Sequence, residues 1–213
     1  AGSIPVGRAI SGETMSTILF DLDDTLIQSM YVWEDAITAL FKELHIDMDF
    51  ERAKQTFMAK RFSEVLVYIK KYFYPHATIQ QMNDFCMAFV IDQYQHHVPA
   101  TKGAVEFVHE QAKKGTTMAV VTSNDMHLTK TVLKRLDMYE YLTEIFSAED
   151  LHMTKREPEI YRYALDKLHA SPKDTLVFED SMYAIETARS LGIRCIGIEN
   201  DWNRRDFMRN HVE

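Results

Sequence analysis

The chain has 213 residues, of which 46% are hydrophobic and 26% are charged. This composition predicts a packed globular protein, of a size that suits one large domain or a core with an insert. The formal net charge of −8 argues against nucleic acid as a partner, because a phosphate backbone requires clustered Lys and Arg. No apolar run approaches the ~18–20 residues of a membrane span, so we expect no membrane partner either.

Cysteine usage and the N-terminal sequence predict a cytoplasmic protein. Cys86 and Cys195 lie in apolar surroundings without CxxC spacing, which is typical of reduced thiols in a core. The segment AGSIPVGRAISGET lacks the basic start and the apolar stretch of a signal peptide. We interpret residues 1–14 as a flexible N-terminal arm or a cloning remnant. A monomer is the favoured state.

The first predicted element is a buried strand at residues 17–21, within the segment TILFDLDDTL. Three carboxylates, those of Asp21, Asp23 and Asp24, lie where this strand ends. A buried carboxylate costs free energy unless a positive charge lies beside it. The cluster therefore indicates a bound cation, a basic side chain, or both.

Residues 29–97 are predicted to form four helices inserted after the first strand. No glycine lies between Gly12 and Gly103, and apolar residues recur at helical spacing. The residues expected on the buried faces of the first and last of these helices are Trp33, Ile37, Leu40, Phe41 and Leu44, then Met82, Phe85, Phe89 and either Ile91 or Tyr94.

Strands and helices alternate after Pro99. Short apolar segments predict strands in TTMAVVTSND, EIFSAED, DTLVFEDS and IRCIGI, with helical segments between them. Such alternation is typical of a parallel sheet that is covered by helices on both faces. The expected fold is α/β, with a Rossmann-like, doubly wound core domain formed by residues 15–28 and 98–213.

Three of the predicted strands finish with polar residues. These residues lie at the carboxyl ends of the strands, where open α/β sheets bind ligands. In chain order they are Asp21; Thr122, Ser123 and Asn124; and Glu179 and Asp180, with Lys155 in the loop before a helix. Clustered carboxylates favour Mg²⁺, while the hydroxyl and backbone N–H groups near Thr122 and the charge of Lys155 suit a phosphate. This combination indicates phosphoryl transfer through an aspartyl-phosphate.

Asp23 lies two residues beyond Asp21. If the backbone stays extended there, both carboxylates point to the same side. Asp21 can then attack phosphorus while Asp23 protonates the leaving oxygen. Asp23 afterwards deprotonates the water that hydrolyses the intermediate.

Four segments resemble, in order, the motifs of the haloacid dehalogenase-like (HAD) hydrolases. DLDDTL resembles the first motif, VVTSND the second, KREPEIY the third with its lysine, and VFEDSMYAIETARSLGI the fourth with its acidic pair. The resemblance covers nearly the whole chain and is closest to the branch of phosphatases and β-phosphoglucomutase. It implies that the inserted helices, residues 29–97, are an α-helical cap domain that selects the substrate.

The resemblance also implies roles for individual residues. Asp21 would be the nucleophile and a Mg²⁺ ligand, and Asp23 the acid and base, with its backbone carbonyl on the metal. Thr122 and its neighbours Ser123 and Asn124 would bind phosphate together with Lys155. The remaining metal ligands would be Asp180 and Glu179, the latter either directly or in support.

Several positions depart from the common family pattern. They are Asp24 in place of Gly, Gln28 in place of Asp, Arg156 in place of Pro, and Tyr183-Ala184 in place of Asn-Gly. None removes a catalytic group. Within the inserted helices, Lys60 and Arg61 are possible substrate-binding residues, although a solvated helix face explains them too.

The favoured function is a Mg²⁺-dependent phosphatase that acts on a small phosphorylated metabolite. Asp23 argues against halide removal, because that branch of the family lacks an acid at this place. A hexose-phosphate mutase of the β-phosphoglucomutase type is the enzymatic alternative. A non-catalytic binding protein on the same scaffold is the alternative from another class, although every catalytic position here is filled.

Overall fold

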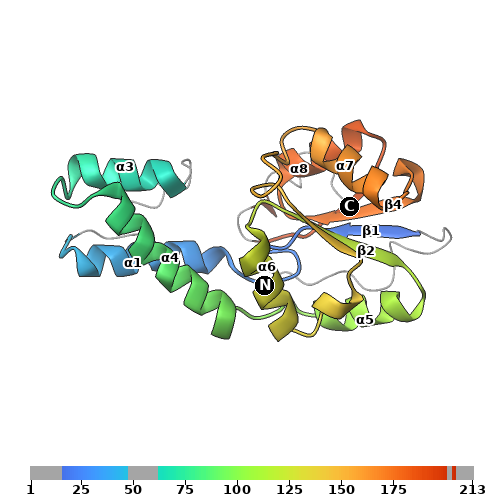
Figure 1. The fold of residues 1–213 in the computed structure, drawn as a ribbon, viewed down its shortest axis with the longest axis horizontal. Coiled ribbons are helices and arrows are strands. Elements are labelled where there is room, and N and C mark those ends of the chain that lie inside the picture. The colour runs from blue at the N-terminus through green and yellow to red at the C-terminus, as the bar shows by residue number, and fades with distance from the viewer. Residues whose placement is uncertain (1–15, 48–61, 201–202, 205–213) are drawn as a thin grey trace. The chain divides into compact units, whose positions relative to one another are not determined.

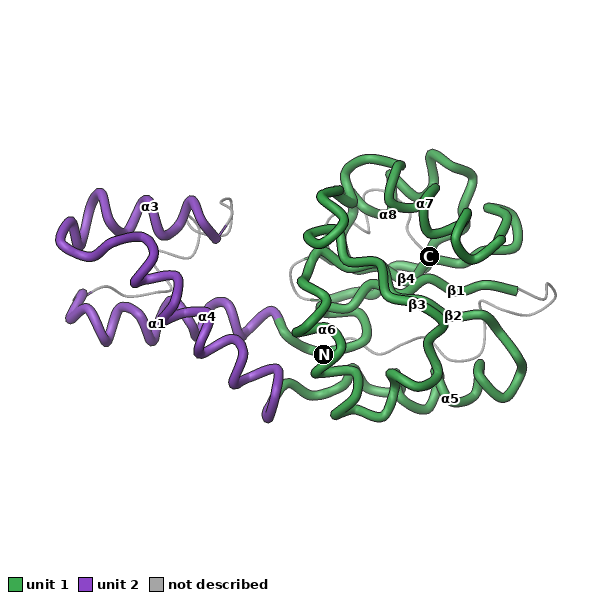
Figure 2. Tube along the Cα trace, in the orientation of Figure 1, with its two compact units in different colours: residues 1–29, 98–213 green, residues 30–97 purple. Residues whose placement is uncertain are grey.

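The computed structural model describes residues 16–47, 62–200 and 203–204. The chain forms two compact units, residues 1–29 with 98–213 and residues 30–97 (Figure 2). Part of the second expected helix of the insert, together with Lys60 and Arg61, lies outside the described residues. None of the helices in the described segments is sufficiently long and apolar to span a bilayer.

A five-stranded parallel sheet forms the centre of the first unit (Figure 1). Its strands, in the order β3-β2-β1-β4-β5, are β3 (Glu144–Ser147), β2 (Thr117–Thr122), β1 (Thr17–Phe20), β4 (Thr175–Glu179) and β5 (Arg194–Gly197). Leu19 of β1 is in register with Ala119 and Val177. All four residues of β1 are buried, as expected for a central strand with both faces covered.

Helices cover both faces of this sheet. Figure 1 shows α7 (Glu159–Lys167) and α8 (Met182–Ser190) on one face, with α5 (Ala104–Lys113) and α6 (Met126–Arg135) on the other. On the α5 side the rings of Phe20, Phe107 and Phe178 pack with centroids 5.3–6.1 Å apart. The expected doubly wound α/β core is therefore confirmed.

The α7 and α8 side of the sheet has its own apolar core. Leu19, Val121 and Val177 from the strands pack there with Ile160 of α7 and Ile185 of α8. Two 3-10 helices, η1 (Tyr139–Tyr141) and η2 (Pro172–Asp174), lie between the longer elements. Because β1 lies between β2 and β4 and the three strands are parallel, their carboxyl ends lie side by side.

The described part of the second unit consists of α1 (Met30–Glu43), α3 (Phe62–Tyr72) and α4 (Ile79–His96). Thr78 and Gln81 form a capping box at the start of α4: the Gln81 N–H donates to Thr78 Oγ1 over 3.1 Å, and the Thr78 N–H to Gln81 Oε1 over 3.0 Å. Both α1 and α3 pack against α4.

The buried faces of these helices differ from those expected. In α4 the buried row is Met82, Cys86, Val90 and Tyr94, whereas Phe85 and Phe89 are half-buried. In α1, Val32 and Ala36 are buried with Ile37, Leu40 and Phe41, and Trp33 and Leu44 are half-buried. The expected rows were partly wrong because apolar residues surround much of each helix, so periodicity alone could not select one face.

Candidate active site

Asp21 stands at the carboxyl end of β1 and extends the sheet. Its N–H donates to the Phe178 carbonyl of β4 over 2.9 Å, and its side chain is 5% exposed. The chain then turns, because the N–H groups of Leu26 and Ile27 both donate to the Leu22 carbonyl. Asp23 therefore lies in a turn rather than in a continuing strand.

The same turn explains the unusual Asp24. Its backbone has φ = 56°, in the left-handed region that favours glycine. Its Oδ1 accepts a hydrogen bond from the Ser29 N–H over 3.0 Å. The aspartate thus closes the loop, which offsets the cost of its backbone conformation.

Ser29 and Asn124 both donate to the Asp23 carboxylate. Ser29 Oγ donates to Asp23 Oδ1 over 2.6 Å, and Asn124 Nδ2 donates to Asp23 Oδ2 over 3.4 Å. Ser29 is fully buried and Asp23 half-buried. The Asp23 carboxylate is therefore oriented by donors while part of it still reaches solvent.

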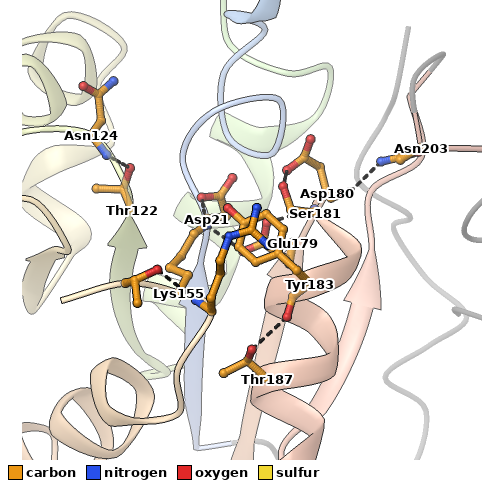
Figure 3. A network of polar contacts seen from close by, with 12 residues as sticks. Asp21, Thr122, Asn124, Lys155, Glu179, Asp180, Ser181, Tyr183, Thr187 and Asn203 are labelled. Carbon is orange, nitrogen blue, oxygen red and sulfur yellow. Dashed lines mark hydrogen bonds and ion pairs between the residues drawn. The ribbon is translucent and has the colours of Figure 1, made fainter. Parts of the chain in front are cut away.

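Lys155 forms a buried ion triad with two strand ends (Figure 3). Its Nζ lies 2.5 Å from Asp21 Oδ1 and 2.8 Å from Glu179 Oε2, and its side chain is 3% exposed. Burial alone would lower the pKa of Lys155, but the carboxylates of Asp21 and Glu179 raise it well above its ordinary value. The lysine is therefore a permanent cation at the carboxyl edge of the sheet.

All four carboxylate oxygens of Glu179 and Asp180, at the end of β4, accept hydrogen bonds from the protein. Glu179 Oε1 accepts from the Ser181 N–H over 2.9 Å, and Glu179 Oε2 from Lys155. Asp180 Oδ1 accepts a hydrogen bond from Ser181 Oγ, and Asp180 Oδ2 accepts one from Asn200 Nδ2. The donor–acceptor distance is 3.1 Å in both. Asp21 differs, since within the described part of the chain its Oδ2 receives no hydrogen bond.

The acidic cluster fits a divalent cation. One oxygen from each of Asp21, Glu179 and Asp180 lies within 4.8 Å of the others. Burial, followed by repulsion from Asp21, raises the pKa of Glu179 to about 7, and the same two causes raise the pKa of Asp180 well above its ordinary value. Lys155 therefore does not balance the three carboxylates. Hard oxygen ligands with surplus negative charge are what Mg²⁺ binds.

The loop after β2 reaches the same edge from the other side. Thr122 is fully buried, and its Oγ1 accepts from the Asn124 N–H over 3.0 Å (Figure 3). Asp125 caps α6 by accepting from the Leu128 N–H over 2.9 Å. Ser123 is exposed and makes no side-chain hydrogen bond within the described segments, so no contact brings it to the acids.

Sequence reasoning missed three residues that hold the site. They are Ser29, Asn200 and Asn203. Asn203 Nδ2 donates to the carbonyls of Asp180 and Ile198, both over 2.8 Å. The two asparagines also bind each other, because each side-chain carbonyl accepts from the other's N–H over 2.8–2.9 Å. The segment ENDWN carried the signal, since asparagines three residues apart are typical of such turns.

Comparisons with known proteins agree with this geometry. The family model described as haloacid dehalogenase-like hydrolase matches residues 18–198. Validoxylamine A 7'-phosphate phosphatase from Streptomyces hygroscopicus subsp. limoneus is 27% identical over 84% of each chain. A phosphorylated carbohydrates phosphatase from Thermotoga maritima is 33% identical over about half of each chain, 49% of this one and 48% of the relative.

A solved structure shows the same fold. CbbY from Rhodobacter sphaeroides, in complex with xylulose-(1,5)bisphosphate, superposes with a TM-score of 0.73 at 20% identity. The alignment covers 90% of this chain and 89% of that one. With its motifs gathered at one edge of the sheet and the family model matched over most of its length, the chain belongs to the haloacid dehalogenase-like hydrolases.

Proposed function

We propose that this hydrolase is a Mg²⁺-dependent phosphatase that acts on a small phosphorylated metabolite through a phosphoryl group carried on Asp21. One observation carries the proposal. The Lys155 ammonium pairs with Asp21 Oδ1 at 2.5 Å, while Oδ2 of the same carboxylate receives no donor from the described residues. One oxygen is thus fixed, and the other is left to react.

In the first step, Asp21 Oδ2 attacks phosphorus and the bond from phosphorus to the leaving oxygen breaks. Lys155 offsets the repulsion between the Asp21 carboxylate and an incoming phosphate dianion. Asp23, held by Ser29 at 2.6 Å, gives its proton to the leaving oxygen. The product alcohol departs and the phosphoryl group stays on Asp21.

In the second step, Asp23 is ionised and takes a proton from water. That water attacks phosphorus, the bond from phosphorus to Asp21 breaks, and inorganic phosphate leaves. The hydrogen bonds from Ser29 and Asn124 keep the Asp23 carboxylate in one orientation through both steps. The same carboxyl group is therefore the acid first and the base second.

Asp21, Asp180 and Glu179 would hold the magnesium ion, with the backbone carbonyl of Asp23. When bound, the ion supplies charge neutralisation for the phosphate oxygens. Thr122, Asn124 and Lys155 would bind the phosphoryl group. Thr122 Oγ1 already accepts from the Asn124 N–H, so its own proton is available for a phosphate oxygen.

The substrate class is proposed from the relatives, of which one is named a phosphatase of validoxylamine A 7'-phosphate and another a phosphatase of phosphorylated carbohydrates. We propose that the second unit, residues 30–97, is a cap that selects among such esters. We also place the protein in the cytoplasm, in line with the free, buried thiols of Cys86 and Cys195.

Release of phosphate from p-nitrophenyl phosphate tests the proposal. We expect turnover with Mg²⁺, none after chelation with EDTA, and none in Asp21→Asn. If wild type shows no turnover with Mg²⁺, or if Asp21→Asn matches wild type, the proposed function is wrong. β-Glucose 1-phosphate separates the alternatives, since isomerisation without phosphate release would identify a mutase.

A further inference from the structure

The end of β3 carries none of the predicted site residues, yet its last side chain reaches the loop between β2 and α6. Ser147 is fully buried and in register with Thr122 of β2. Its Oγ shares one proton between the Asn124 carbonyl oxygen, 2.8 Å away, and Asp150 Oδ2, 2.6 Å away. The hydroxyl of Ser147 therefore ties β3 to the loop that carries Asn124.

Asp150 holds the other end of the same loop. Its Oδ2 accepts a hydrogen bond over 2.9 Å from the N–H of Met126, the first residue of α6, which has no acceptor within the helix. The hydrogen bonds from Ser147 and then from Met126 hold the pKa of Asp150 below its ordinary value, so this acceptor is ionised. Ser147 and Asp150 together thus clamp the loop at Asn124 and at Met126.

A second turn of the same kind shows that the local geometry alone does not require this clamp. Ser171 Oγ donates to Asp174 Oδ2 over 2.7 Å, and the Asp174 N–H donates to Ser171 Oγ over 3.3 Å, at the amino end of β4. The corresponding distances between Ser147 and Asp150 are 2.6 and 3.1 Å. Within the described residues, the side chains of Ser171 and Asp174 bond only inside their own turn. The bonds into a neighbouring loop are therefore particular to Ser147 and Asp150.

The clamped loop orients Asn124, which donates from Nδ2 to Asp23 Oδ2 over 3.4 Å. The Asn124 Oδ1 accepts from the Asp125 N–H over 3.0 Å, which turns Nδ2 toward Asp23. The Asn124 N–H donates to Thr122 Oγ1, and the Asn124 carbonyl accepts from Ser147 (Figure 3 shows the contact with Thr122). Among these three contacts that hold Asn124, the one from Ser147 comes from another strand.

We propose that Ser147 and Asp150 are positioning residues, which fix the loop of Asn124 and so keep the Asp23 carboxyl group aimed at the leaving oxygen. The proposal rests on the proposed phosphatase function, in which Asp23 is the acid. Ser147 and Asp150 act through Asn124 rather than on the substrate. Their loss should therefore impair protonation of the leaving group more than it impairs attack on phosphorus.

Two aryl phosphates of similar size separate these two effects. Phenol has a pKa of about 10, like a tyrosine side chain, whereas p-nitrophenolate is a much weaker base and leaves with little help from an acid. Phenyl phosphate therefore depends on a well-placed acid more than p-nitrophenyl phosphate does. The value of kcat/KM covers the steps up to departure of the leaving group, so the ratio of the two kcat/KM values reports on the acid.

Ser147→Ala should lower kcat/KM for phenyl phosphate about tenfold more than for p-nitrophenyl phosphate, part of the ~10²–10⁴-fold that a positioned acid contributes. Ser171→Ala is the matched control, because it removes the same hydroxyl from the same kind of turn at the opposite edge of the sheet. It should leave the ratio at its wild-type value. A ratio unchanged in Ser147→Ala, or changed equally in Ser171→Ala, overturns the proposal.

The two Asp150 variants distinguish hydrogen bonding from charge. Asp150→Asn keeps an oxygen that can accept from Ser147 and Met126, so the ratio should stay near its wild-type value. Asp150→Ala removes that oxygen and should change the ratio in the same direction as Ser147→Ala. Equal ratios in the two variants would overturn the role of Asp150.

A double variant tests whether Ser147 acts through Asn124. Asn124→Ala should change the ratio by itself, and Ser147→Ala added to it should change the ratio no further, because the side chain that the serine positions is already gone. Two independent changes that multiply in the double variant would overturn the proposed route. Circular dichroism of each variant confirms the fold.

The same assays separate the positioning role from the phosphatase function. Wild type that hydrolyses both esters, with a ratio that Ser147→Ala leaves unchanged, is still a phosphatase, and only the positioning role is wrong. Wild type that hydrolyses p-nitrophenyl phosphate but not phenyl phosphate has no acid to position, which also overturns the proposal. Wild type without any turnover in Mg²⁺ removes the proposed function itself.

Discussion

The carboxyl ends of β1 and β4 lie next to each other, and both carry acids, yet their environments differ. At β4, each oxygen of Glu179 and Asp180 accepts a hydrogen bond from the protein. At β1, among the described residues, a donor reaches Asp21 at Oδ1 alone, and that donor is Lys155. Neighbouring strands thus place similar side chains together but surround their oxygens with different donors.

The difference separates reactivity from positioning. An oxygen already held by donors is a weaker nucleophile and a well-oriented ligand, whereas an oxygen without a donor can attack. We therefore propose that the chemistry takes place at the end of β1 and that the end of β4 is the scaffold of the metal site. Variants at the two ends should fail in different ways.

Asp21→Asn should produce the largest effect. Asparagine keeps the shape of the side chain but removes the nucleophilic oxygen, so kcat should fall by about 10⁴-fold or more. Phosphate release from p-nitrophenyl phosphate measures the loss, and circular dichroism confirms the fold. Turnover above about a hundredth of the wild-type rate would move the nucleophile away from β1.

Lys155→Met should cause the largest loss of stability. Removing the buried cation leaves Asp21 and Glu179 facing each other, which should cost about 3–5 kcal/mol in the free energy of unfolding. Urea denaturation measures this value. In the control Arg162→Gln, which breaks an exposed pair, the change should stay below about 1 kcal/mol. Equal losses in both variants would contradict the burial argument.

Mg²⁺ should stabilise the folded protein, because it relieves the surplus negative charge of Asp21, Glu179 and Asp180. At a concentration about 100 times its dissociation constant, a ligand adds about 2.7 kcal/mol. Thermal unfolding with Mg²⁺ and with EDTA measures the difference. Asp180→Asn should reduce it, and an unchanged melting temperature in wild type would argue against the metal site.

Asn200→Ala should have the smallest of these effects. It removes the donor to Asp180 Oδ2 and so loosens a ligand without deleting it, which should weaken Mg²⁺ binding about tenfold. Titration of the melting temperature with Mg²⁺ gives the affinity. An unchanged Mg²⁺ affinity in Asn200→Ala would show that the hydrogen bond from Asn200 does not position the Asp180 carboxylate for the metal.

The sequence was sufficient to predict the sheet and the meeting of the acids, because β-branched runs ending in polar residues mark parallel strands. The spacing of Asn200 and Asn203 suggests a turn, but the sequence could not predict that both bind Asp180, which lies twenty residues or more away with no local period to link them. Nor could the sequence predict that Asp24 closes the loop after β1, because this depends on a backbone φ of 56°.

The helical unit was less predictable than the core. In α4 both the Met82–Cys86–Val90–Tyr94 row and the flanking phenylalanines are apolar, so packing decided which row is buried.

Trapping the phosphoryl group tests the central claim most directly. Wild-type protein is mixed with Mg²⁺ and an excess of a ³²P-labelled sugar phosphate on which it is active, quenched with acid during the first turnover, and digested for peptide mapping. We expect a hydroxylamine-sensitive label on Asp21 that is absent from Asp21→Asn. Active wild-type enzyme that forms no covalent label, with inversion of configuration at phosphorus, would contradict it.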